Sequence, residues 1–302
     1  TRQEYSSTIS VQTISRDAFL EERRAILIAS RLDDVATVMA NLKHDCHISI
    51  KWFTENGRRL TQKKIQFMLG SSRTLEPQEL HVNGTTSIMS ENSVKALGVI
   101  IDNRLKFSQH VSACCTKAAR QLNALARISR YLDVKSRKII YQSFISSNFS
   151  YCPLVWHFCG IQNNNKLEKN QERSLRIIYG DYVSLYTDLL SSAGTSTILI
   201  SRLKQMLVEV FKIVNNQNPS CLDGIFQINQ SSYSLRDPLR LHQPKCNSTN
   251  YGLRTFSYTG AKLWNDLPFH IKHDNDDDLK LFKAKLKEWN GPSSTNTGFN
   301  YV

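Results

Sequence analysis

Hydrophobic and polar residues follow different patterns in the two parts of this chain. The apolar run from Val94 to Ile101 predicts a buried strand, and Gly98 interrupts it as glycine does where another backbone approaches closely. From Ser108 onward, apolar residues recur at steps of three and four, which is the spacing of a helix. The pattern therefore predicts mixed α and β structure before this junction and helices after it.

The segment before the junction begins with a predicted helix from Val35 to about Phe53. Asp33 and Asp34 precede it and are favourable N-cap residues, because a carboxylate accepts hydrogen bonds from the free N–H groups of the first turn. Asn56-Gly57 follows it and is a typical signal for a helix end.

Strand-forming residues after this helix predict a small sheet. The pair Asn83-Gly84 is a strong hairpin signal, because both residues readily adopt the left-handed backbone of a tight turn. Segments of strand composition flank this pair, and others precede and follow the hairpin. The predicted strands are Lys64–Leu69, Glu79–Val82, Thr85–Ile88 and Val94–Ile101, which together form a β element over about residues 64–102.

The region beyond Ser108 predicts a series of amphipathic helices. In the first, an apolar stripe extends to Leu125, while Lys117, Arg120 and Arg127 lie off it. The expected fold class is thus α+β and predominantly α-helical, with the β element followed by a helical bundle. Further helices are predicted at Lys135–Ser146, after Pro153, at Asn165–Tyr179, Ser201–Val214 and Leu279–Trp289, with an irregular connection over residues 220–260.

Composition and charge indicate a polyanionic partner inside the cell. The chain has 302 residues and a net charge of +13, and clustered Lys and Arg neutralise phosphates. Its seven cysteines are an odd number without the spacing of a disulfide framework, so an intracellular location, nuclear or cytoplasmic, is expected rather than secretion. The most apolar region, Ile139–Gly160, contains too many polar side chains for a membrane span.

Two groups of residues with metal-ligating side chains occur in the sequence. His44 and His47 share one helix face, so they form either half of a zinc site or an ordinary helix surface, and no complementary Cys or His pair lies nearby. Cys152 and Cys159 are farther apart than the ligand pairs of zinc fingers, so both are expected to be core thiols. The sequence therefore predicts no metal site.

The large aromatic side chains allow a stacking role or a packing role. Nucleic-acid bases stack on exposed aromatic rings, but the apolar neighbours of these residues favour core packing. Neither Gly-x-Ser-x-Gly nor Gly-x-x-x-x-Gly-Lys occurs, so nothing supports a hydrolase or an NTPase. The aromatic residues considered are Trp156, Phe158, Trp264 and Trp289.

An ordered series of short motifs carries a family resemblance. The motifs are Ile50-Lys-Trp-Phe-Thr-Glu-Asn56, Lys64-Ile-Gln-Phe67, Val94-Lys-Ala-Leu-Gly-Val-Ile-Ile-Asp102, Phe107-Ser-Gln-His110, Tyr151-Cys-Pro-Leu-Val-Trp156, Asn170-Gln-Glu-Arg173, Leu175-Arg-Ile-Ile-Tyr179, Tyr251-Gly252 and Gly260-Ala-Lys-Leu-Trp-Asn-Asp-Leu-Pro268. With these motifs, residues 33 to about 290 resemble the C-terminal part of the reverse transcriptase of a LINE-type, jockey-like non-LTR retrotransposon.

The resemblance implies a division of the chain into regions. Residues 33–105 would be a remnant of the polymerase palm, with Leu97 and Gly98 in a primer-grip-like strand. Residues 106–180 would be a helical thumb-like domain, which closes on the template-primer duplex. Residues 1–32 are unassigned, residues 181–290 match the family's extension beyond the thumb, and residues 291–302 are expected to be a disordered tail.

The densest positive stretch of the chain lies around this thumb-like region. Between Arg104 and Lys138 there are nine Lys or Arg residues and one acid, Asp133. Such cations bind phosphates without reading base sequence, although a solvated helix face is the alternative interpretation. The expected partners are the RNA and DNA of a template-primer duplex, with no membrane. The predicted contact residues are Arg104, Lys106, Lys117, Arg120, Arg127, Arg130, Lys135, Arg137 and Lys138.

The catalytic carboxylates of such a polymerase do not occur in their usual motif. In this enzyme class, clustered carboxylates hold two divalent ions, and the family's Tyr-x-Asp-Asp hairpin is missing from this sequence. Arg31-Leu-Asp-Asp34 is either a decayed form of that hairpin or the helix cap described above. We expect no catalytic residue and no cofactor in this chain, whereas Mg²⁺ would serve the intact parent polymerase.

These observations predict a C-terminal fragment of a retrotransposon RNA-directed DNA polymerase. It is expected to contact nucleic acid but not to catalyse alone. A domesticated, non-enzymatic helical module that binds nucleic acid or protein is the alternative, and an untranslated relic is the third possibility.

Overall fold

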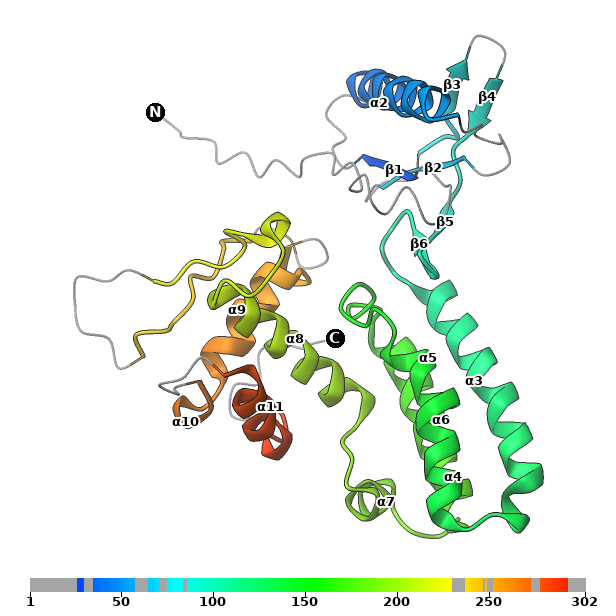
Figure 1. Cartoon of the computed structure of the whole chain (residues 1–302), viewed down its shortest axis with the longest axis vertical. Coiled ribbons are helices and arrows are strands. Elements are labelled where there is room, and N and C mark those ends of the chain that lie inside the picture. Colours follow the sequence, from blue (N-terminus) through cyan, green and yellow to red (C-terminus); the bar gives the residue numbers. More distant parts are fainter. Residues whose placement is uncertain are drawn as a thin grey trace. The chain divides into compact units, whose positions relative to one another are not determined.

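The computed structural model describes residues 26–29, 35–57, 65–70, 75–83, 86–229, 237–246, 248, 252–272 and 278–292 (Figure 1). Over these residues the chain is mostly helical, and its strands all lie in the N-terminal part, as the predicted fold class requires. The chain divides into two compact units, Thr1–His110 and Val111–Val302. No helix in the described ranges is long and apolar enough to span a lipid bilayer.

The first unit contains a parallel strand pair joined through a helix. Strand β1 (Ile26–Ala29) pairs with β2 (Gln66–Leu69), and α2 (Val35–Glu55) lies between them in sequence. Parallel strands need such a long connection, because the chain must cross back to the end at which the first strand began before the second strand can start. Helix α2 confirms the helix predicted there, and Gly57 after it has a left-handed backbone, φ 66°. The capping prediction for Asp33 and Asp34 lies outside the described residues.

The hydrophobic core of this unit forms between α2 and the strands. Leu42 and Cys46 on α2 are buried together with Phe67 and Leu69 on β2 and with Leu80. Strands β3 (Glu79–Asn83) and β4 (Thr86–Met89) pair antiparallel, which confirms the predicted hairpin. The turn at residues 84–85 lies outside the described residues.

The prediction of a single strand from Val94 to Ile101 is wrong. This segment belongs to a hairpin of β5 (Ser93–Ala96) and β6 (Val99–Asp102), in which Val94 pairs with Ile101. Its two turn residues, Leu97 and Gly98, have φ values of 45° and 84°, and a two-residue turn with both values positive matches the twist of the strands. The apolar run hides this turn because Leu97 adopts a backbone that leucine rarely takes. The prediction of a single sheet is also wrong, because the strands of the described residues form three separate two-stranded sheets.

A carboxylate organises the loop that follows the hairpin. The Oδ1 atom of Asp102 accepts hydrogen bonds from the backbone N–H groups of Arg104, at 3.1 Å, and Lys106, at 3.0 Å. Its Oδ2 atom accepts a third from the N–H of Phe107, at 2.5 Å. Within this loop Leu105 and Phe107 have positive φ values, 53° and 55°. Asp102 therefore holds a strained loop just before the long helix begins.

Replacing this carboxylate is expected to destabilise the first unit. Asp102→Ala removes three hydrogen bonds to a charged acceptor and should lower the free energy of unfolding by about 1–2 kcal/mol, since the loop is partly open to water. Asp102→Asn keeps one acceptor oxygen and should lose less. Native-state hydrogen exchange of the backbone amides of this unit, followed by mass spectrometry, measures both changes. Equal stability of Asp102→Ala and the natural chain would show that the loop does not depend on this side chain.

His110 adds a pH dependence to the same unit. Its Nδ1 atom accepts a hydrogen bond from the backbone N–H of Ile100, at 3.3 Å, and burial lowers its pKa below the ordinary value. Below a pH of about 6.5 the unfolded chain therefore takes up a proton that the folded chain does not, so stability falls as the pH falls, by up to about 1.4 kcal/mol per pH unit. Urea midpoints at pH 7.5 and 5.5 test this. His110→Gln should reduce the difference between them, and an unchanged difference would contradict this role.

The second unit contains most of α3 and a helical group packed on it. Helix α3 (Ser108–Ile128) has the predicted stripe: Val111, Ala118, Leu122 and Leu125 are buried, so this prediction is confirmed. A short 3₁₀ turn, η2 (Ser129–Tyr131), leads into a continuous helical stretch. That stretch consists of α4 (Val134–Ile140), the π-helical turn η3 (Tyr141–Ser146) and α5 (Ser147–Ser150).

Two further helices complete this group. The prediction of a helix after Pro153 is wrong, because residues 151–159 form bends and turns. Helix α6 (Ile161–Tyr179) begins earlier than predicted, and α7 (Tyr186–Ala193) was not predicted at all. Asn148 on α5 donates to the side chain of Gln121 on α3, and Arg173 on α6 donates to Asn123 on α3. These contacts hold α5 and α6 against α3.

A separate core joins the C-terminal helices (Figure 1). On α8 (Ile198–Val214), Phe211 stacks on Phe282 of α11 (Leu279–Glu288), with ring centroids 4.4 Å apart. Trp264 of α9 (Phe256–Asp266) lies beside both rings, and α10 (Phe269–Lys272) follows. Residues 220–260 were expected to be irregular, but they include the 3₁₀ turn η4 (Ser220–Leu222) and the start of α9.

The large aromatic side chains pack in this unit as the packing interpretation predicts. Trp156, Trp264 and Trp289 are buried, and Phe158 packs against the same C-terminal core. The indole N–H of Trp264 donates to the carbonyl of Leu239, at 2.9 Å, and so ties the irregular segment to α9. The predicted disordered tail, apart from its first two residues, lies outside the described residues.

Candidate nucleic-acid interface

One face of α3 is basic and free of acids. The helix has 21 residues, none of them Asp or Glu, and Lys117, Arg120 and Arg127 are exposed on it. Arg120 and Arg127 are seven residues apart, which places them on the same face about 10 Å apart. The opposite face of α3 is the buried apolar stripe, so the cations point outward because the helix is amphipathic.

No acid in the described part of the chain neutralises this face. The ion pairs among the described residues all lie elsewhere: three lie within α2, α6 and α8, and the fourth joins Lys272 of α10 to Asp237. Asp133, the one acid of the positive stretch, caps α4 by accepting from the N–H of Ser136, at 3.2 Å. Hydrogen bonds from Ser136 also lower the pKa of Asp133 below its ordinary value. The exposed cations on α3 therefore remain available for an anionic partner.

Two more exposed cations follow α3 in the sequence. Arg130 is exposed, and its guanidinium carbon lies 4.7 Å from the ring centroid of the exposed Tyr131. Lys135 is exposed on the first turn of α4. A guanidinium over an aromatic ring keeps its outer N–H groups free to contact phosphate.

Two of the predicted contact residues have structural partners instead. Arg137 donates through Nη1 to the carbonyls of Ile177, at 3.3 Å, and Ile178, at 2.7 Å, and so binds the end of α6. The ammonium nitrogen of Lys138 lies 5.0 Å from the ring centroid of Tyr179. Both side chains are half-buried, and these contacts of their charged groups hold α4 to α6.

The remaining predicted residues lie in the first unit. Arg104 and Lys106 are exposed in the loop that Asp102 holds. Leu97 stands at the tip of the β5–β6 hairpin with 43% of its surface exposed, beside Gly98. The primer-grip role of Leu97 and Gly98 stays a prediction, now for a hairpin tip rather than for the middle of a strand.

The predictions for the histidine pair and for the two cysteines have different outcomes. His44 and His47 are exposed on α2, and nowhere in the described ranges do three His, Cys, Asp or Glu side chains gather as a metal site requires. Cys159 is buried, and burial raises its thiol pKa. Cys152 is exposed, so its prediction as a core thiol is wrong; it lies on the turn that replaces the expected helix.

Comparison with known proteins shows a distant relation to the reverse transcriptase of a retrotransposon. The similar protein is the probable RNA-directed DNA polymerase from transposon X-element of Drosophila melanogaster. The two sequences are 25% identical over 167 residues, which cover 51% of this chain and 18% of that protein. The chain thus matches less than a fifth of the relative's length. No protein-family profile and no solved structure matches the chain.

Proposed function

We propose that this chain is the C-terminal part of a retrotransposon reverse transcriptase that contacts the RNA and DNA of a template-primer duplex. The observation that carries the proposal is the acid-free, exposed cationic face of α3, formed by Lys117, Arg120 and Arg127. The distant relation to an RNA-directed DNA polymerase supports a nucleic acid as the anion that this face meets.

The chemistry of this face favours contact with the nucleic-acid backbone. Lys and Arg side chains bind phosphate oxygens and release condensed counterions, so affinity falls steeply as salt rises. These contacts position a duplex without reading its sequence. The proposed interface should therefore bind duplexes of different sequence with similar affinity.

The hairpin tip at Leu97 and Gly98 gives a second proposed contact, with the primer strand. A partly exposed leucine at a two-residue turn presents a small apolar surface on a rigid support. Such a surface packs against a sugar or base more readily than it binds a phosphate. This role rests on the family resemblance.

Catalysis by this chain alone is not part of the proposal. In the enzyme class, clustered carboxylates hold the Mg²⁺ ions that stabilise the attacking and leaving oxygens. The described residues offer no cluster of three ligand side chains that fits such ions, and Asp33 and Asp34 lie outside them. We therefore assign no metal-dependent step to the described residues and expect no primer extension by this chain.

Two assays on the same primed RNA template test the proposal. Fluorescence anisotropy should give an association constant whose logarithm falls linearly with the logarithm of salt concentration, and templates of other sequences should give similar constants. A primer-extension assay with Mg²⁺ should show no incorporation. Absence of salt-sensitive binding would overturn the proposed contact, whereas robust incorporation would overturn the proposal that catalysis needs the rest of the parent enzyme.

A domesticated protein-interaction module is the second candidate. Exposed apolar side chains favour it: in the loop between α6 and α7, Val183 is 94% and Leu185 is 70% exposed, and Tyr182 lies beside them. Such a group of apolar side chains is typical of a protein contact. A folded chain that fails to bind any duplex at low salt would favour this candidate.

A further inference from the structure

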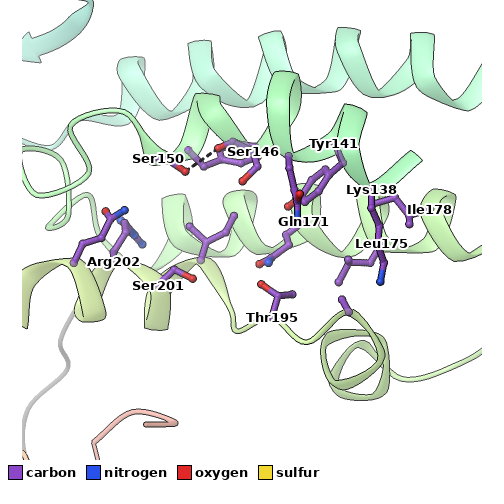
Figure 2. A pocket seen from close by; sticks show the side chains of 15 residues that line it. Lys138, Tyr141, Ser146, Ser150, Gln171, Leu175, Ile178, Thr195, Ser201 and Arg202 are labelled. Carbon is purple, nitrogen blue, oxygen red and sulfur yellow. Dashed lines mark hydrogen bonds between the residues drawn. The ribbon is translucent and has the colours of Figure 1, made fainter. Parts of the chain in front are cut away.

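Helix α6 carries a row of exposed cations that the sequence did not single out. Its members, Lys166, Lys169 and Arg173, follow one another at steps of three and four residues, so they lie on one face of the helix. The opposite face points inward, and Gln171 and Leu175 on it line a cavity shared with α8 (Figure 2). The cationic row therefore points away from this cavity, toward solvent.

The row on α6 meets the basic face of α3. Arg173 donates through Nη2 to the Oδ1 of Asn123 on α3, at 2.7 Å. Asn123 follows Arg120 by three residues and precedes Arg127 by four, so all three lie on one face of α3. The hydrogen bond therefore places the guanidinium of Arg173 beside the two arginines of α3.

A second point of approach lies toward the N-terminal ends of the two helices. Burial raises the pKa of the Cys115 thiol on α3 to about 11, although the nearby positive charge of Lys166 lowers it in part. Cys115 precedes Asn123 by eight residues, and Lys166 precedes Arg173 by seven. The two helices thus run side by side in the same direction over about two turns, and their cations form one surface.

The two acids of α6 are engaged by other residues. An oxygen of Glu172 lies 2.7 Å from the guanidinium of Arg176. Glu168 accepts hydrogen bonds from the hydroxyl of Tyr186, at 2.8 Å, and from the backbone N–H of Leu199, at 2.9 Å. Helix α3 contributes no acid. Like charges on the two helices repel one another, so a bound polyanion would stabilise this surface.

We propose that α3 and α6 bind one duplex together, with the row on α6 contacting phosphates of the strand opposite to the one that α3 contacts. This inference rests on the proposed function and extends its interface to a second helix. The axes of packed helices lie about 8–10 Å apart, and the grooves of a duplex are about 6–12 Å wide. Two parallel rows of cations therefore match the two rows of phosphates that border a groove. A single strand offers only one such row, so the surface should prefer a duplex.

Neutralising the row on α6 tests this inference. The variant is Lys166→Gln with Lys169→Gln, which leaves Arg173 and its hydrogen bond in place. Fluorescence anisotropy with a labelled RNA–DNA duplex should show affinity reduced roughly tenfold or more near 0.1 M salt. The slope of log affinity against log salt should fall by about 1.8, because each contact contributes about 0.9. Affinity for the single-stranded RNA of the same sequence should be nearly unchanged, because one strand can still bind along α3.

The matched control is Lys280→Gln with Lys283→Gln, which removes two exposed cations of α11 and should leave both affinities nearly unchanged. An α6 variant that binds the duplex as the α11 variant does would overturn the second row and leave contact by α3 intact. Equal losses for duplex and single strand would contradict contact with both strands. If the natural chain binds no duplex, the proposed function fails together with this inference.

Discussion

Reversing two charges on α3 is expected to lower affinity for an RNA–DNA duplex about 100-fold near 0.1 M salt, since each lost phosphate contact costs roughly tenfold. The variant is Arg120→Glu with Arg127→Glu, on the exposed face described above. The slope of log affinity against log salt should fall by about 1.8, because each contact contributes about 0.9. Fluorescence anisotropy over a salt series measures both quantities.

The matched control makes the same charge change elsewhere. Lys280→Glu with Lys283→Glu alters two exposed residues of α11, and it should reduce affinity much less. Circular dichroism should show intact helices in both variants, because none of these side chains is in a core. If the α11 variant loses as much affinity as the α3 variant, binding depends on net charge alone and the α3 interface is wrong.

Trp264→Ala is expected to lower the free energy of unfolding of the second unit by about 3–5 kcal/mol, because it leaves a large cavity in a core. Trp264 is among the largest fully buried side chains, and it lies 6.5 Å from Phe211 and 6.0 Å from Phe282 between ring centroids. Its indole N–H also donates to the carbonyl of Leu239, which would lose its partner. Urea unfolding followed by circular dichroism measures the loss.

The control for this prediction is an exposed aromatic in the same region. Phe269 is 53% exposed on α10, so Phe269→Ala should change stability by no more than about 0.5 kcal/mol. Trp264→Phe keeps most of the buried volume and should fall between the two. A small effect of Trp264→Ala would mean that α8, α9 and α11 do not share one cooperative core.

Helices with a strong amphipathic period could be predicted from the sequence. The stripe of α3 and its outward cations follow directly from residue spacing, and α2, α8 and α11 lie close to their predicted bounds. In each case a long repeat of apolar positions outweighs local propensity. The hairpin of β3 and β4 could be predicted because Asn83-Gly84 is a strong turn signal between two segments of strand composition.

Elements that depend on distant or unusual contacts could not be predicted. The β5–β6 turn requires a positive φ at Leu97, which leucine avoids, so the sequence pattern favours a continuous strand. Strand β1 gains its partner β2 about 40 residues later, so nothing local marks it. The start of helix α9 falls in the region predicted to be irregular, where Ser, Asn, Pro and Gly are frequent.

The sequence predicted which residues of the candidate interface carry charge, but not which of them are exposed. The sequence identifies the cations, yet only the fold separates the exposed Arg120 and Arg127 from Arg137, which binds carbonyls of α6. The burial of Arg202 on α8, outside this interface, was likewise not predicted from the apolar residues on either side of it.

Site-specific photo-crosslinking tests the central claim, duplex contact by α3, most directly. A benzoylphenylalanine at Ala124, an exposed position on the face of Arg120 and Arg127, should crosslink to a primed RNA template at low salt and lose the crosslink at about 0.5 M salt. The same group at Phe269 serves as the control. The account predicts a crosslink at Ala124 that is clearly stronger than at Phe269; a crosslink at Phe269 alone, or equal yields at both, would contradict it.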